Sequence, residues 1–191
     1  MEEERIKSAL EIAMERISGL PRLTPEEIAA QKEREYGPIG VSLAHRYLEG
    51  ALQVNQLRAE AERHEGEQGR IVRRVLLRTL GGRIRLDDAS GARQALAGMA
   101  LFMADKELSG EAEGRLRDIL DAYERDKAER AREFESIARG GLLKKGICGS
   151  AVRPNLEQDE GWRQELVRIQ EKYQPGLAKL REMLLQALGA T

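Results

Sequence analysis

The sequence is poor in aromatic residues and in cysteine. Its 191 residues include two Phe, one Trp and four Tyr, and so few large side chains cannot fill a large globular core. The single cysteine, Cys148, has no partner for an intramolecular disulfide. This scarcity predicts an elongated protein, or helices that complete their burial in an oligomer.

A strong net charge and a long apolar run are also missing. The formal net charge is −1, so no global field attracts nucleic acid or a membrane. No stretch approaches the roughly 18 consecutive apolar residues of a membrane span. The acidic start, Met1–Glu4, does not resemble a signal peptide. We therefore expect a cytoplasmic protein without membrane insertion, for which nucleic acid is a disfavoured partner.

Charged residues are abundant, at 34% of the chain. Together with the dominance of Ala and Leu, this composition is typical of long helices with narrow apolar stripes. The sequence predicts an all-α fold: an elongated helical bundle with one or more long coiled-coil-like helices and a glycine-rich ordered loop. We expect one domain over 1–191, with N-terminal helices in 1–86 and a C-terminal helical hairpin in 87–191.

The apolar spacing and the start and stop signals place the individual helices. Thr24-Pro25 is a strong helix start that Glu27 completes as a capping box. Gly37-Pro38 is expected to stop that helix, and Pro175 to kink or divide the last one. The expected helices cover 2–18, 24–36, 39–64, 70–80, 88–104, 109–138 and the region after 157.

The helix over 109–138 has a regular seam with a charged centre. Its seam positions, spaced four and three residues apart, are Leu116, Leu120, Tyr123, Lys127, Arg130, Phe134 and Ile137. This pattern predicts that the two ends of the seam are buried and that its middle is solvated.

Arginines gather on one face of the helix over 70–80. The four candidates for binding an anion or a partner are Arg70, Arg73, Arg74 and Arg78. Such a ridge suits phosphates or an acidic protein surface. The alternative is a solvated face that pairs with the chain's own glutamates.

The segment 139–155 resembles neither a helix nor an ordinary linker. It combines four glycines with Lys144, Lys145 and Ser150, which are the ingredients of a phosphate nest. The residue order lacks the Gly-Lys-Ser/Thr of a Walker loop. One interpretation is an ordered turn whose apolar residues Leu142, Leu143, Ile147, Ala151 and Val152 pack against the bundle. The other is a binding loop.

Reactive groups are scarce. Cys148 is distant in sequence from the only histidines, His45 and His64. No nucleophile and base pair or metal-ligand set is visible, so we assign no catalytic residue and expect neither a metal nor another cofactor.

Two pieces of the chain resemble an uncharacterised bacterial family of all-helical cytoplasmic proteins. The first is Lys7–Ala13. The second is Lys145–Val152 with Pro154-Asn155, followed by the helix of Trp162. The shared loop is Gly-Ile-x-Gly-Ser-Ala-Val-x-Pro-Asn. The resemblance implies a helical fold, and it implies no activity or catalytic residue.

Together these features favour a non-enzymatic helical interaction or scaffold protein that forms a homo-oligomer. The alternative is a regulatory or adaptor module that binds an anionic ligand or an acidic protein through the arginine-rich helix, or through Lys144 and Lys145. An enzyme that uses the 139–155 loop is a third hypothesis.

Overall fold

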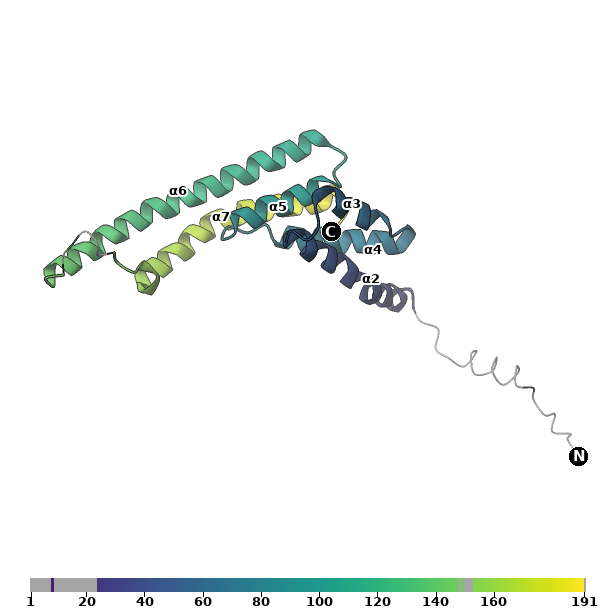
Figure 1. The fold of residues 1–191 in the computed structure, drawn as a ribbon, viewed down its shortest axis with the longest axis horizontal. Coiled ribbons are helices and arrows are strands. Elements are labelled where there is room, and N and C mark those ends of the chain that lie inside the picture. Colours follow the sequence, from purple (N-terminus) through teal and green to yellow (C-terminus); the bar gives the residue numbers. More distant parts are fainter. Residues whose placement is uncertain (1–7, 9–23, 148, 150–152, 191) are drawn as a thin grey trace, which may run out of the picture. The chain divides into compact units, whose positions relative to one another are not determined.

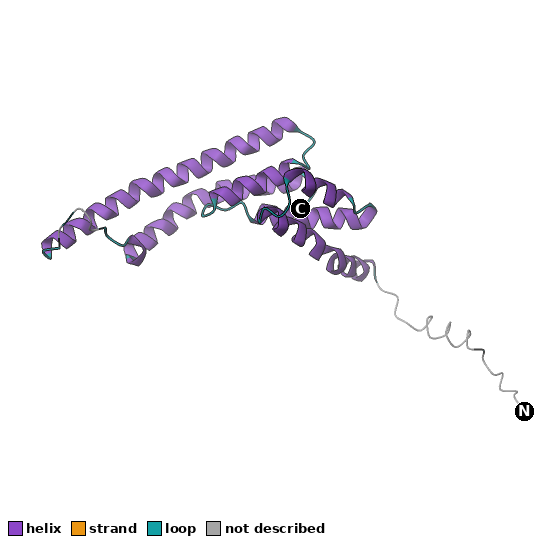
Figure 2. Ribbon diagram, in the orientation of Figure 1, coloured by secondary structure: helices purple, strands orange, loops and turns teal. Residues whose placement is uncertain are grey.

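The chain is all-α, as predicted. The computed structural model describes residues 8, 24–147, 149 and 153–190, and within them every regular element is a helix (Figures 1 and 2). The elements are α2 (Pro25–Leu48), α3 (Val54–Glu62), α4 (Gly66–Gly82), α5 (Ala89–Ala100), α6 (Lys106–Lys144), the short 3₁₀ helix η1 (Leu156–Gln158) and α7 (Glu160–Ala187). The helix expected over 2–18 lies, except for Ser8, outside the described residues.

The chain divides into two compact units, 1–35 and 36–191. The described part of the first unit holds the start of α2, where the expected capping box forms. The backbone N–H of Thr24 donates to Glu27 Oε2 at 2.7 Å, and the N–H of Glu27 donates to Thr24 Oγ1 at 3.2 Å. These two bonds satisfy donors that a helix start leaves without intrahelical partners.

The expectation that Gly37-Pro38 stops a helix is wrong. α2 continues through Pro38 to Leu48, because its second half is held by tertiary packing. Gly40 lies so close to α4 that an added Cβ would be 2.5 Å from the carbonyl oxygen of Val72. The break comes later, at Gly50, whose φ is +77°. The continuous helix expected over 39–64 is therefore split between α2 and α3.

The core of the second unit is formed around α4 and α5. Its fully buried members include Leu76, Leu77, Leu80, Ala95 and Met99. Tyr47 and Gln94 fasten α2 to α5 by a reciprocal pair of hydrogen bonds. The Tyr47 hydroxyl donates to the Gln94 carbonyl at 3.0 Å, and Gln94 Nε2 donates to the Tyr47 carbonyl at 2.9 Å. Burial raises the pKa of the Tyr47 hydroxyl, which keeps it a donor.

α6 is longer at both ends than predicted. Asp105 begins it, accepting the N–H groups of Glu107 and Leu108, and it ends at Lys144. The first part of the 139–155 segment is therefore helix and not loop. Glycine lowers helix stability by about 1 kcal/mol relative to alanine, but α6 continues through Gly140 and Gly141. It ends just before Gly146, which adopts a φ of +77°.

α7 is a single helix that contains Pro175. The alternative of two separate helices is therefore wrong. Burial of Ile169 before the proline and of Leu177, Leu180 and Leu184 after it keeps both halves in one helix. None of the described helices combines the length and the apolar content that a bilayer crossing requires.

We predict that Gly98→Ala destabilises the protein. An added Cβ would be 2.7 Å from Tyr47 Cε1 and 3.1 Å from Leu80 Cδ1, so the ring that fastens α2 to α5 would have to move. The expected loss is about 1–3 kcal/mol of unfolding free energy in urea denaturation. The control is Gly110→Ala in α6, where a Cβ meets nothing within 4 Å. Equal stability of the two variants would contradict this packing.

Candidate functional site

α6 and α7 lie side by side as an antiparallel hairpin (Figure 1). Near the core, Tyr123 and Tyr173 meet edge to face with ring centroids 6.0 Å apart. Towards the tip of the hairpin, where α6 ends and α7 begins, Phe134 and Trp162 meet with centroids 5.7 Å apart. These aromatic pairs fix the register in which the two helices face each other.

The seam prediction holds at one end of α6 and fails at the other. Leu116, Leu120 and Tyr123 are buried, as expected. Phe134 is half-buried, but Ile137 is 73% exposed. The reason is that α7 begins only at Glu160. Since Trp162, in its first turn, already lies opposite Phe134, helix α7 does not extend far enough to cover Ile137.

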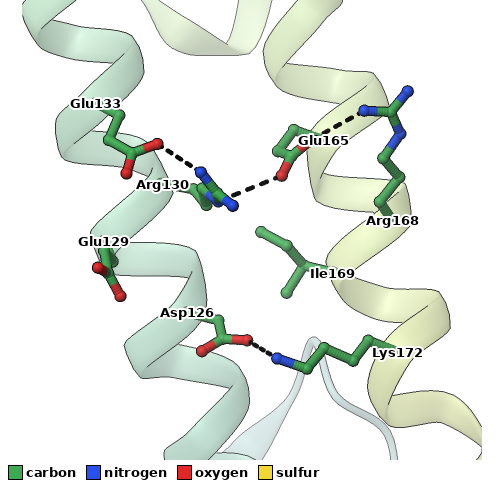
Figure 3. Close-up of a pocket in the computed structure, with 8 residues that line it drawn as sticks. All are labelled: Asp126, Glu129, Arg130, Glu133, Glu165, Arg168, Ile169 and Lys172. Carbon is green, nitrogen blue, oxygen red and sulfur yellow. Dashed lines mark hydrogen bonds and ion pairs between the residues drawn. The ribbon is translucent and has the colours of Figure 1, made fainter.

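A polar groove of about 380 Å³ lies between the two helices (Figure 3). Seven of its eight lining residues are charged, and both signs are represented. The lining residues are Asp126, Glu129, Arg130, Glu133, Glu165, Arg168, Ile169 and Lys172.

Arg130 and Glu165 link the helices across this groove, with Nε and Oε1 3.4 Å apart. Each of the two is also held by a neighbour on its own helix. Arg130 Nη1 donates to Glu133 Oε2 at 2.7 Å, and Arg168 Nη1 donates to Glu165 Oε2 at 3.3 Å. Hydrogen bonding to Glu133 and the charges of Glu133 and Glu165 raise the pKa of Arg130. The groove therefore holds a network of ion pairs.

Asp126 forms the second link. Its Oδ2 accepts Lys172 Nζ at 2.6 Å and the Tyr173 hydroxyl at 2.7 Å. The hydrogen bond from Lys172, followed by that from Tyr173, lowers the pKa of the Asp126 carboxyl. The same bond raises the pKa of Lys172. A carboxylate held in its ionised form by two donors is suited to clamping the helices together, not to accepting a proton at neutral pH.

Arg73 and Arg78 on α4 contact main-chain carbonyls within the fold. Arg73 Nη2 donates to the Phe102 carbonyl at 3.0 Å, and its guanidinium lies 5.1 Å from the centroid of the Phe102 ring. Arg78 Nε donates to the Ala190 carbonyl at 2.8 Å. Arg70 is exposed and Arg74 is half-buried. An anion bound at this ridge would compete with these contacts of Arg73 and Arg78. The local sequence did not reveal the contacts, because their partners are distant in sequence.

The other candidates belong to the end of the hairpin. Lys144 and Lys145 are exposed at the end of α6, which Figure 1 shows at the far tip from α4. Leu143 and Ile147 are 61% and 48% exposed, so the expectation that they pack against the bundle is wrong. The helix carries them beyond the start of α7. Ser150, Cys148, Ala151 and Val152 lie outside the described residues.

His45 and His64 take part in no metal-binding group that the structure reveals. Across residues 24–147 and the other described positions, no three His, Cys, Asp or Glu side chains are arranged to hold a metal ion.

No protein-family model, curated protein or solved structure matches the chain. The structure agrees with the helical character that the loop resemblance implied. The shared loop motif and the bacterial family stay predictions.

We predict that Asp126→Asn loosens the hairpin in a pH-dependent way. The pKa of Asp126 is lower in the folded protein, so its stabilisation is complete above the unfolded pKa of about 3.9 and is lost as pH falls through the folded pKa. The variant should unfold at a Tm lower by less than about 4 °C at pH 7, because the exposed pair is screened. The difference in Tm between the variant and the unchanged protein should disappear in strong acid, where Asp126 is protonated.

The fluorescence of Trp162, the single tryptophan, provides a local readout next to Phe134. The matched control is Asp118→Asn, which removes an exposed carboxylate of the same helix. A pH-independent difference, or an equal effect of the control, would show that Asp126 does not clamp the hairpin.

Proposed function

We propose that this chain is a non-enzymatic helical interaction protein whose binding arm is the α6–α7 hairpin. The observation that carries the proposal is the position of exposed apolar side chains. The most exposed large apolar residues of the described chain are Ile137 (73%), Leu143 (61%), Val167 (51%) and Ile147 (48%). All four belong to the hairpin or its tip. Single exposed apolar residues are ordinary, but their concentration on one arm favours an interaction surface.

The interior of the hairpin supports the same function. Arg130 with Glu165, and Asp126 with Lys172, join the helices from within. The aromatic pairs join them on either side of the groove. A surface held in place before binding loses little conformational entropy when a partner arrives. The charged groove thus serves to stiffen the arm, and the exposed apolar side chains are left for contact.

We further propose that the arm binds a second copy of the chain, in a homo-oligomer with coiled-coil-like contacts. Ile137, at the end of the α6 seam that α7 does not cover, and Val167 on α7 are both exposed. A second copy would remove these side chains from water, which is favourable by about 1.5–3 kcal/mol for a fully buried aliphatic side chain. The scarcity of aromatic residues, which limits the core of one chain, supports the same conclusion.

A second candidate function is supported by Lys144 and Lys145. Both are exposed, and the sequence around them has no acidic residue from 136 to 156. An adaptor that binds an anionic partner would use this tip in preference to the α4 ridge, where Arg73 and Arg78 have contacts inside the fold.

We predict that sedimentation equilibrium of the full chain gives a mass of at least two copies. The double variant Ile137→Asp/Val167→Asp should weaken self-association by about tenfold or more, because it places charge where apolar side chains meet. Its circular dichroism should remain helical, since both positions are exposed.

Val41→Asp/Val54→Asp is the matched control, with the same change in charge at positions of α2 and α3 that are 38% and 39% exposed. It should leave the mass unchanged. A monomer at every concentration, or an equal loss in the control, would overturn the homo-oligomer.

A further inference from the structure

The hairpin tip, residues 139–147, carries charge of one sign. Over residues 136–156 the charged residues are Arg139, Lys144, Lys145 and Arg153, and none is acidic. The whole chain is almost balanced, with 32 Lys and Arg against 33 Asp and Glu. The local excess of positive charge is therefore a property of the tip and not of the composition.

The end of α6 holds this tip in a defined conformation. Gly146 adopts φ +77° and donates its N–H to the Leu143 carbonyl at 3.0 Å, while the N–H of Ile147 donates to the Leu142 carbonyl at 3.0 Å. This is the Schellman arrangement, which brings the residue after the glycine back over the last helical turn. Leu143 and Ile147 are therefore held at the helix end beside Lys144 and Lys145.

The basic residues of the tip differ from those of the groove. In the groove, Arg130, Arg168 and Lys172 each lie within 4 Å of a carboxylate. At the tip the surrounding sequence supplies no carboxylate, and the lysines stand next to exposed aliphatic side chains. Positive charge beside aliphatic groups is the combination that binds anionic membrane interfaces, where cations meet the headgroups and apolar groups enter between them.

We propose that the tip, residues 139–147, docks peripherally on the surface of an anionic phospholipid bilayer. Lys144 and Lys145 contact the headgroup phosphates, and Leu143 and Ile147 enter the boundary between headgroups and acyl chains. The inference rests on the proposed function, because it takes the hairpin as the binding arm. It adds the chemical class of a second partner.

The size and the charge of the tip favour a bilayer over an acidic protein. A stable protein interface takes about 20–30 residues from each side, which is far more than the end of one helix presents. A fluid bilayer accepts side chains one at a time and needs no matching pocket. Its surface also repels any carboxylate, which suits a tip without one. In a homo-oligomer, several tips would bind one surface and strengthen each weak contact.

The test is co-sedimentation of the full chain with lipid vesicles. One set contains phosphatidylcholine only, and the other contains about one third phosphatidylglycerol. The chain should partition onto the anionic vesicles alone, and binding should fall several-fold between about 0.05 and 0.5 M salt. Lys144→Glu/Lys145→Glu should lower partitioning by about tenfold or more. Leu143→Ser/Ile147→Ser, which leaves the charge unchanged, should also lower it.

The matched control is Lys106→Glu/Lys179→Glu, with the same change in net charge at exposed positions away from the tip. It should retain binding. Equal partitioning onto both vesicle types, or an equal loss in the control, would overturn the proposal. So would binding of soluble polyglutamate through Lys144 and Lys145 without vesicle binding, which would indicate an acidic protein. Self-association that persists without vesicle binding would reject only this inference and not the homo-oligomer.

Discussion

Tyr173 joins the apolar and the charged parts of the α6–α7 interface. Its ring packs edge to face on the buried Tyr123, and its hydroxyl donates to Asp126. On the core side of this residue the helices are held by burial of Leu116, Leu120 and Leu177. On the tip side, ion pairs across the groove accompany the burial of Ile169 and Trp162. The hairpin can therefore continue beyond the core, in a chain with too few aromatic residues to extend an apolar interface along its whole length.

The change from apolar burial to charged contacts at Tyr173 explains how the hairpin extends beyond the core. Exposed ion pairs contribute little individually, but the groove pairs combine with two aromatic contacts in one register. Glu165 has only 19% of its side chain exposed, and it receives both Arg130 and Arg168. Arg130, Arg168 and Lys172 in the groove are each paired with a carboxylate. Lys144 and Lys145, at the end of α6, lie in a stretch of sequence without acidic residues.

The local sequence was sufficient for the class of fold, the cap at Thr24 and the buried positions Leu116 and Leu120, because these depend on spacing within one helix. It was insufficient where distant residues decide. α2 continues through Pro38 because Gly40 packs on α4, and Arg78 meets a carbonyl 112 positions away. The groove could not be predicted for the same reason, since it brings together residues such as Asp126 and Lys172 that are 46 positions apart. Glycines were misleading for a further reason: Gly140 lies within α6 and Gly146 ends it, and only the sign of φ distinguishes them.

The fixed register of the hairpin has a mechanical consequence. Sliding α7 by one helical turn, about 5.4 Å, would separate Arg130 from Glu165 and Asp126 from Lys172, and both aromatic pairs with them. These contacts therefore oppose sliding of one helix along the other. The core end of α7 contacts α4, and Arg78 of α4 holds the Ala190 carbonyl just beyond α7. α7 thus runs unbroken from the groove to the contact with α4.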